Sequence, residues 1–224
     1  MYKTKLPAII SNPTSAVRHC VIWLHGLGAS GNDFVPIVEE LGIQDSLGIR
    51  FIFPHAPQIP VAINGGMVMP AWYDITEIDL MKRADKAGIT HSSATITSMI
   101  NDEIASGIKA SNIVIAGFSQ GGVIALDAGL RFSKPLAGIM ALSTYIPMQD
   151  SLPSAEQSGN TNVPIFYGHG EFDPVIPISQ ARTSQQFLES SNYSVEIHDY
   201  PIEHSVSPQE IIDIKLWLHH VFNV

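Results

Sequence analysis

Residues 113–126 read Ile-Val-Ile-Ala-Gly-Phe-Ser-Gln-Gly-Gly-Val-Ile-Ala-Leu: an apolar β-type run, a serine bracketed by glycines, and a second apolar run. This order predicts a sharp strand-to-helix turn with Ser119 at its apex. Such a turn strains the serine backbone, and glycines at positions 117 and 121 leave the room that the turn needs. The Ser119 hydroxyl is then expected beside the positive end of a helix, where a nucleophile that generates an oxyanion is favoured. The alternative is a Gly-Ser turn without a chemical role.

Around this stretch, β-rich runs alternate with amphipathic segments. Strands are expected at residues 20–24, 50–53, 113–116, 136–142, 163–167 and 195–197. Helices are expected at residues 33–41, 92–106, 121–131, 179–190 and 208–221. The alternation predicts an α/β fold with a mostly parallel central sheet and helices on both faces. A chain of 224 residues fits one domain spanning 1–224. The connection 145–162 is too short for a separate cap domain.

The composition narrows the classes of function. Hydrophobic residues make up 45% of the chain and charged residues 15%, as in ordinary core-forming proteins. The net charge of −9 and the absence of a lysine and arginine cluster argue against nucleic acid as a partner. The N-terminus does not resemble a secretory signal, and no apolar run approaches the roughly 18 residues of a membrane span. With Cys20 the only cysteine, in an apolar run, we expect a cytoplasmic protein with a buried thiol.

A serine nucleophile needs a base to remove its proton, and the base needs a carboxylate to fix its tautomer. In strand-turn-helix serine sites, the acid and then the histidine follow the serine, on loops after later strands. His204 lies between the expected strand 195–197 and the last helix, so we predict that it is the base. Less favoured are the other histidines that follow Ser119, which are His169, His198, His219 and His220.

The predicted acid is Asp173, which lies on the loop that follows the expected strand 163–167. Glu171 comes earlier on the same loop. Asp199 is too near His204 in sequence to reach it from a different strand. A purely structural role also remains open for Asp173, because Asp-Pro commonly begins a turn.

An oxyanion hole requires two backbone amides, one from the residue after the nucleophile and one from a loop after an earlier strand. Gln120 supplies the first. Leu27, within the glycine-bearing stretch 25–28, is the expected second donor. A phosphate-binding loop is less favoured there because the pattern lacks a P-loop lysine. His25 is expected to be structural, and no H-E-x-x-H spacing indicates a metal site.

Residues 54–74 carry prolines and glycines together with many apolar side chains. An irregular segment of this length is usually functional. We expect it to form a wall that contacts substrate, because apolar side chains on such a segment suit an adaptable pocket. The substrate-binding candidates are Met67, Val68, Met69 and Trp72. The alternative is a surface loop that folds its apolar residues into the core.

Several segments together resemble the phospholipase/carboxylesterase family of small α/β hydrolases. The matching stretches run in order along the chain: His25-Gly26-Leu27-Gly28, Phe53-Pro54-His55-Ala56-Pro57, Met69-Pro70-Ala71-Trp72-Tyr73-Asp74-Ile75, Gly117-Phe118-Ser119-Gln120-Gly121-Gly122, Leu142-Ser143, His169-Gly170, Asp173-Pro174-Val175-Ile176-Pro177 and His204-Ser205. The chain departs from the family at Ala71, where a serine is common.

The resemblance implies an α/β-hydrolase fold and a catalytic triad of Ser119, Asp173 and His204. It also implies that Leu27 and Gln120 are the oxyanion donors and that no cofactor is needed. The expected activity is hydrolysis of carboxylic esters or thioesters through an acyl-enzyme. A second expectation is an acyl-protein thioesterase or lysophospholipase that receives long acyl chains at a membrane surface.

The expected partners are therefore a small ester, an acyl-lipid or an acylated protein. The apolar segment 54–74 could serve a transient membrane contact or a homodimer equally well. A catalytically silent relative that only binds a ligand is the alternative from another class. It is disfavoured because all three triad positions are occupied.

Overall fold

The computed structural model describes residues 6–76 and 85–223. Its centre is a seven-stranded sheet with the order β1-β3-β2-β6-β7-β8-β9. The strands are β1 (Ala8–Ser11), β2 (His19–Leu24), β3 (Ile49–Pro54), β6 (Ile113–Phe118), β7 (Gly138–Leu142), β8 (Ile165–Gly170) and β9 (Val195–Tyr200). Only β1 runs antiparallel to its neighbour. The prediction of a mostly parallel sheet is confirmed.

The parallel arrangement follows from the buried sequences of the strands. All six residues of β2 are buried, as are those of β8. Strands covered on both faces need apolar residues at every position, which is why these runs lack alternation. The edge strand β1 is half-exposed, so its short sequence carries no such signal and does not predict a strand.

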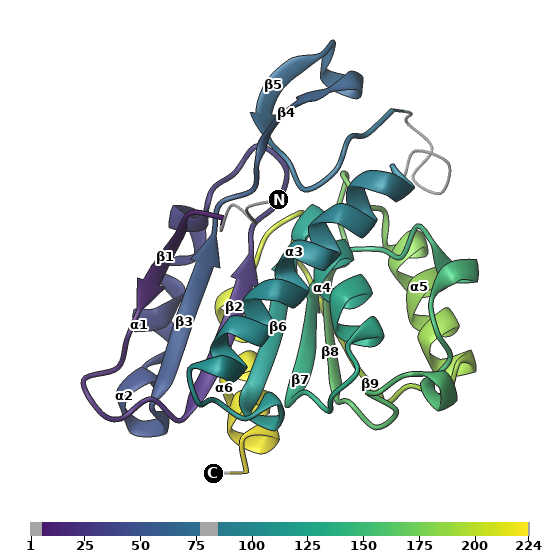
Figure 1. Cartoon of the computed structure of the whole chain (residues 1–224). Helices are drawn as coiled ribbons and strands as arrows, with labels where there is room; N and C mark the ends of the chain where they lie inside the picture. Colours follow the sequence, from purple (N-terminus) through teal and green to yellow (C-terminus); the bar gives the residue numbers. More distant parts are fainter. Residues whose placement is uncertain (1–5, 77–84, 224) are drawn as a thin grey trace.

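Within the part of the chain that the structure describes, six α-helices cover the two faces of the sheet (Figure 1). They are α1 (Ile37–Leu41), α2 (Gln44–Leu47), α3 (Lys86–Ala105), α4 (Gln120–Arg131), α5 (Ile178–Ser190) and α6 (Pro208–Val221). Apolar residues of α3, α4 and α5 form one core with one side of the sheet. Those of α1, α2 and α6 form a second core on the other side. Helices on both faces are therefore confirmed.

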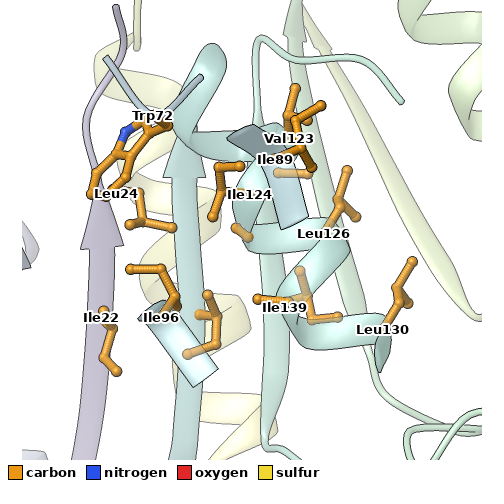
Figure 2. Packing of buried hydrophobic residues seen from close by; sticks show 14 of the residues in the cluster. Ile22, Leu24, Trp72, Ile89, Ile96, Val123, Ile124, Leu126, Leu130 and Ile139 are labelled. Atoms are coloured by element: carbon orange, nitrogen blue, oxygen red, sulfur yellow. The ribbon is translucent and has the colours of Figure 1, made fainter. Parts of the chain in front are cut away.

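The sheet pleat decides which core each strand residue joins. In β2, Ile22 and Leu24 point to the first core, whereas Val21 and Trp23 belong to the second. Figure 2 shows the first core, where Ile22 and Leu24 face α3 and α4 side chains and Trp72 lies beyond the strand end. Two packed layers thus hold the strand ends in fixed positions.

Residues 58–70 form a second, two-stranded sheet, so the prediction of an irregular segment is wrong. β4 (Gln58–Val61) pairs antiparallel with β5 (Met67–Pro70), and the short 3-10 helix η2 (Ala62–Asn64) lies between them. We call residues 58–70 the hairpin. It projects beyond the end of the central sheet (Figure 1). A two-stranded ribbon consists only of edges, so it tolerates prolines that a central strand would not.

Other connections in the described chain include short 3-10 helices. They are η1 (Gly31–Phe34), η3 (Ala110–Asn112), η4 (Gln149–Ser151) and η5 (Ala155–Gln157). Residues 145–162 thus contain η4 and η5 where a crossover helix was conceivable. Among the residues that the structure describes, no helix is both long and apolar enough to cross a membrane.

Candidate active site

Ser119 lies between β6 and α4 in a backbone conformation that is rare for a residue with a side chain. Its φ is 54° and its ψ is −120°. The turn is tight: a Cβ at Gly117 would lie 2.2 Å from the Gly121 carbonyl oxygen. A Cβ at Gly121 would lie 2.5 Å from the Leu24 carbonyl oxygen. The two glycines are therefore required by close backbone approaches, as the motif predicts.

The strained turn is held by hydrogen bonds to the end of the neighbouring strand. The Ser119 amide donates to the Leu142 carbonyl at 2.8 Å. The Thr144 hydroxyl donates to the Ser119 carbonyl at 2.7 Å. Strain of this kind persists only where surrounding contacts over-determine it, and these bonds supply such contacts.

Asp173 and His204 are in direct contact. Asp173 lies on the loop after β8 and His204 on the loop after β9, and His204 Nδ1 is 2.6 Å from Asp173 Oδ2. The other carboxylate oxygen, Oδ1, accepts hydrogen bonds from the Val175 and Ile176 amides, each at 2.8 Å. The Asp173 side chain is fully buried. This arrangement places the Nδ1 proton towards Asp173 and leaves Nε2 as the basic nitrogen of His204.

The environment of Asp173 keeps it ionised. Burial, the largest single influence, raises the pKa of Asp173, but the hydrogen bonds from His204 and from the Ile176 and Val175 amides together outweigh it. The net pKa lies below the ordinary value for an aspartate. A carboxylate that is buried yet ionised can orient an imidazole and stabilise it once it is charged.

The backbone joins the acid loop to the base loop. The Glu171 amide donates to the Tyr200 carbonyl at 2.8 Å, and the Phe172 amide donates to the Ile202 carbonyl at 3.0 Å. A Cβ at Gly170 would lie 2.3 Å from the Glu203 carbonyl oxygen. These contacts extend the β8–β9 pairing beyond the strands and fix the separation of the two loops.

Ser119 lies at the same edge of the sheet as the Asp173–His204 pair. β6, β7, β8 and β9 are parallel neighbours, so their carboxyl ends lie along one edge. The ring of Phe118, next to Ser119 in the chain, packs on the His204 ring with a centroid distance of 4.8 Å. The structure therefore brings the three predicted residues to one place.

The loop after β2 lies beside the serine. A Cβ at Gly26 would be 3.4 Å from the Ser119 Cβ, which is an ordinary contact distance and shows how near the loop lies to the serine. Within residues 6–76 and 85–223, neither the Leu27 nor the Gln120 amide donates a hydrogen bond to the protein. Two unused amides on either side of a serine are what an oxyanion hole requires.

His25 has a structural part in this loop. Its side chain is fully buried, with Nδ1 2.7 Å from the Gly26 carbonyl and Nε2 3.0 Å from the Ala56 amide. Burial, the main cause, lowers the pKa of His25, so the ring is neutral, with Nδ1 donating and Nε2 accepting. The imidazole thus ties the loop after β2 to the chain after β3.

His169 is a residue near the acid to which the sequence analysis assigns no role. It is fully buried at the end of β8, and its Nε2 lies 2.9 Å from the Ile176 carbonyl and 3.6 Å from Asp173 Oδ2. The His169 ring braces the loop on which Asp173 sits. His169 lies two residues beyond the expected strand 163–167, between Gly168 and Gly170 and just before Asp173, and this position is the signal that could have identified it.

The four substrate-binding candidates fall into three environments. Met67 and Val68 are 64% and 61% exposed on the outer part of the hairpin. Met69 is partly buried, with its sulfur 3.8 Å from the position of a Cβ on Gly28. Trp72 is only 2% exposed, and its indole nitrogen donates to the His25 carbonyl at 2.8 Å. Met69 and Trp72 therefore lie against the loop that bears Leu27.

The described residues offer no cluster that suits a metal ion. In the described part of the chain, no three His, Cys, Asp or Glu side chains gather closely enough to hold one. The titratable groups at the edge of the sheet are instead arranged as an acid–base pair beside a serine.

Known proteins resemble this chain over nearly its whole length. The family described as Phospholipase/Carboxylesterase matches residues 6–222. Acyl-protein thioesterase 1 of Neurospora crassa is 41% identical over 217 residues, which cover 91% of this chain and 88% of the relative. Acyl-protein thioesterase 1 of Cryptococcus neoformans is 35% identical over 232 residues, which cover 96% and 97%.

Solved structures agree with the fold. The crystal structure of Arabidopsis thaliana SOBER1 has a TM-score of 0.84 and 30% identity, covering 92% of this chain and 99% of that one. Zea mays acyl-protein thioesterase 2 has a TM-score of 0.83 at 24% identity, with 96% and 99% covered, and supports the fold alone. The chain therefore belongs to the phospholipase/carboxylesterase family of α/β hydrolases and is a hydrolase that acts on ester or thioester bonds.

Proposed function

We propose that the chain cleaves acyl esters or thioesters through an acyl-enzyme on Ser119, with His204 as base and Asp173 as its orienting acid. The observation that carries the proposal is the 2.6 Å contact between His204 Nδ1 and Asp173 Oδ2, at the sheet edge where Ser119 occupies its strained turn. A serine, a histidine and an ionised carboxylate in this relation form the usual machinery of acyl transfer.

The reaction follows from these roles. His204 Nε2 takes the Ser119 hydroxyl proton while the serine oxygen attacks the acyl carbonyl carbon. The Leu27 and Gln120 amides stabilise the resulting oxyanion. The tetrahedral intermediate then expels the alcohol or thiol, which takes the proton from His204. Water, deprotonated by His204, attacks the acyl-enzyme; His204 then returns the proton to the Ser119 oxygen as the acid is released.

The substrate class is the finer part of the proposal. Relatives bear the name acyl-protein thioesterase 1, which supports an acylated protein or an acyl-lipid as substrate. The exposed Met67 and Val68 on the hairpin favour a long acyl chain over an acetyl group, and they also suit transient contact with a membrane surface or a second copy of the chain. Cytoplasmic localisation stays a prediction; the lone buried thiol of Cys20 is compatible with it.

The deciding experiment is replacement of the nucleophile. Ser119→Ala is expected to reduce turnover by at least about 1000-fold on p-nitrophenyl butyrate and on palmitoyl thioesters alike. Wild-type protein should be labelled covalently by a fluorophosphonate, and the variant should not. Wild-type turnover by Ser119→Ala would overturn the mechanism. A wild-type protein that is folded yet neither labelled nor active would instead favour the silent binding protein.

Acyl preference is measured on the same pair of proteins. A panel of esters and thioesters with acyl chains from two to sixteen carbons should show higher kcat/KM for the long chains. A steep preference for acetyl or butyryl groups would contradict the long-chain assignment and leave the hydrolytic mechanism intact.

A further inference from the structure

The segment that leaves the hairpin, residues 70–73, touches both arms of the proposed oxyanion hole. We call these four residues the hairpin root. One arm is the loop 25–28 after β2, which carries the Leu27 amide. The other is the first turn of α4, which carries the Gln120 amide. The two arms come from distant parts of the sequence, and the root lies between them.

The root is bonded to the Leu27 arm on both sides of Leu27. The Gly28 amide donates to the Pro70 carbonyl at 2.8 Å. The Trp72 indole nitrogen donates to the His25 carbonyl, also at 2.8 Å. Figure 2 shows the Trp72 ring over the end of β2, near Leu24, and the loop 25–28 begins directly after that strand. The backbone that bears the Leu27 amide is therefore fastened to the root at two points.

The root is bonded to the other arm through the side chain of Gln120. Its Oε1 accepts a hydrogen bond from the Trp72 amide at 2.8 Å, and its Nε2 donates to the Tyr73 carbonyl at 2.8 Å. The Gln120 side chain is buried, with only 3% of the residue exposed. The Trp72 carbonyl in turn accepts from the Ser92 hydroxyl of α3. A primary amide can accept and donate at once without a charge, as these two bonds require.

From these contacts we propose that the Gln120 side chain is a positioning residue that sets the spacing of the two oxyanion amides through the hairpin root. The inference rests on the proposed function, because it concerns the same oxyanion hole. Oxyanion donors act only at about 2.7 to 3.1 Å from the developing charge. A misplacement of about 1 Å can cost about 100-fold in rate. The Gln120 side chain thus supports the rate of the chemical step and does not contact the acyl group.

The same bonds link the hairpin to the rate of the chemical step. An acyl chain that contacts the hairpin shifts or steadies the root, and the root is hydrogen-bonded to the two arms that bear the Leu27 and Gln120 amides. Interactions made by the remote part of a substrate would then appear in kcat as well as in KM, as expected when binding energy is used for orientation.

The first test is Gln120→Met, which keeps the backbone amide and the approximate volume but removes both hydrogen bonds. Turnover is expressed per active site, with sites counted by fluorophosphonate titration, so that any unfolded fraction is excluded. We expect kcat on a short aryl ester to fall about 10- to 100-fold with KM changed less than about twofold. The affinity for a trifluoromethyl ketone that forms a tetrahedral adduct should fall by the same factor.

The second test uses a matched pair of tryptophans. Trp72→Phe removes the indole bond to the His25 carbonyl, and we expect kcat to fall about three- to tenfold. Trp23→Phe is the control, because Trp23 is also buried, lies on β2 and has no hydrogen-bond partner for its indole nitrogen within the described residues. Its kcat per titrated site should stay within about twofold of the wild type.

The outcomes separate this inference from the proposed function. If Ser119→Ala abolishes turnover while Gln120→Met keeps the wild-type kcat per site, the positioning role is wrong and the mechanism stands. A rise in KM alone would likewise overturn it, because that would indicate a binding contact. If Gln120→Met does not fold, the tryptophan pair decides, and equal losses in Trp72→Phe and Trp23→Phe would refute the proposal. An active Ser119→Ala would remove the basis of both proposals.

Discussion

The edge of the central sheet and the hairpin lie next to each other, but they are built in opposite ways. At the sheet edge, Asp173 is fully buried and every approach around Gly117 and Gly121 is close. On the hairpin, Met67 and Val68 are more than half exposed, and a Cβ at Gly65 would meet nothing within 4 Å. Acyl transfer needs fixed geometry, whereas recognition of a flexible acyl chain needs accessible apolar surface. Changes at the edge should therefore affect all substrates, and changes on the hairpin only some.

The largest effect is expected for Asp173→Asn. An asparagine cannot hold the Nδ1 proton of His204 as a carboxylate does, so the imidazole takes the wrong tautomer, and kcat should fall about 10⁴-fold. The loss should be equal for butyryl and palmitoyl substrates, measured as kcat with both. A loss confined to long chains would break the distinction between edge and hairpin.

The next largest effect is expected for Gly121→Ala. The added Cβ would lie 2.5 Å from the Leu24 carbonyl and 2.6 Å from the His25 carbonyl, both of them backbone atoms. The helix must shift, so we expect about 3 kcal/mol of lost stability and about 100-fold less turnover. Urea unfolding and short-ester kinetics measure the two quantities.

Gly65→Ala is the matched control on the hairpin. Gly65 also has a positive φ, 66°, but lies in open space. The substitution should cost only about 1 kcal/mol and leave turnover of a short ester within about twofold. Comparable losses at both glycines would mean that the hairpin is as tightly constrained as the sheet edge.

An intermediate effect, on the pH dependence of stability, is expected from Glu210, which is buried at the start of α6. Its Oε1 lies 2.3 Å from the position that a Cβ on Gly168 would take. Burial, aided by the nearby charge of Asp213, raises the pKa of Glu210 to about 8, although a hydrogen bond with the Ser207 backbone opposes the shift. The folded state therefore holds this proton up to higher pH than the unfolded chain, where the carboxyl loses it near pH 4.

The sign of the pH dependence follows. The contribution of protonated Glu210 to the free energy of unfolding is fully present below about pH 4 and is lost as the pH rises towards 8. Glu210→Gln, which cannot ionise, should flatten the fall in unfolding free energy over this range and raise stability at pH 8 by on the order of 2 kcal/mol. Urea titrations of both proteins at pH 5 and pH 8 measure it. An unchanged slope would show that Glu210 is ionised at neutral pH.

The smallest effect is expected for the double substitution Met67→Ser and Val68→Ser. Loss of apolar contact should lower kcat/KM for palmitoyl substrates about fivefold, corresponding to about 1 kcal/mol of contact area, and leave butyryl substrates unchanged. Ile212→Ser, at another exposed apolar site, on α6, is the control. Equal effects on both chain lengths would remove the hairpin from substrate recognition.

The sequence predicts the sheet edge far better than the hairpin, for a physical reason. Local chemistry specifies α6, whose bounds Pro208–Val221 agree with the prediction because Ser207 and Glu210 form a capping box. The strained turn at Ser119 is likewise predicted by the glycines two positions before and after it. Buried parallel strands are recognisable because both of their faces need apolar residues.

The features that escape prediction depend on contacts between distant residues. The hairpin is stabilised by hydrogen bonds between its two strands, and the prolines in these strands argue against a strand when the sequence is read alone. The hydrogen bonds of the Gln120 side chain join residues that are 47 or 48 positions apart, so the sequence around Gln120 does not predict them. The antiparallel β1 is similarly too short and too exposed to stand out.

The position of β9 has a consequence for how the enzyme fails on heating. Among the described residues, β9 pairs only with β8, so it is an edge strand of the sheet, and the loop that carries His204 follows it directly. Local opening of a structure starts where few neighbours hold it. Fraying of this one strand would carry the base away from the serine while the other six strands stay paired. We expect activity to disappear at a lower temperature than the far-ultraviolet circular dichroism, and to return on cooling.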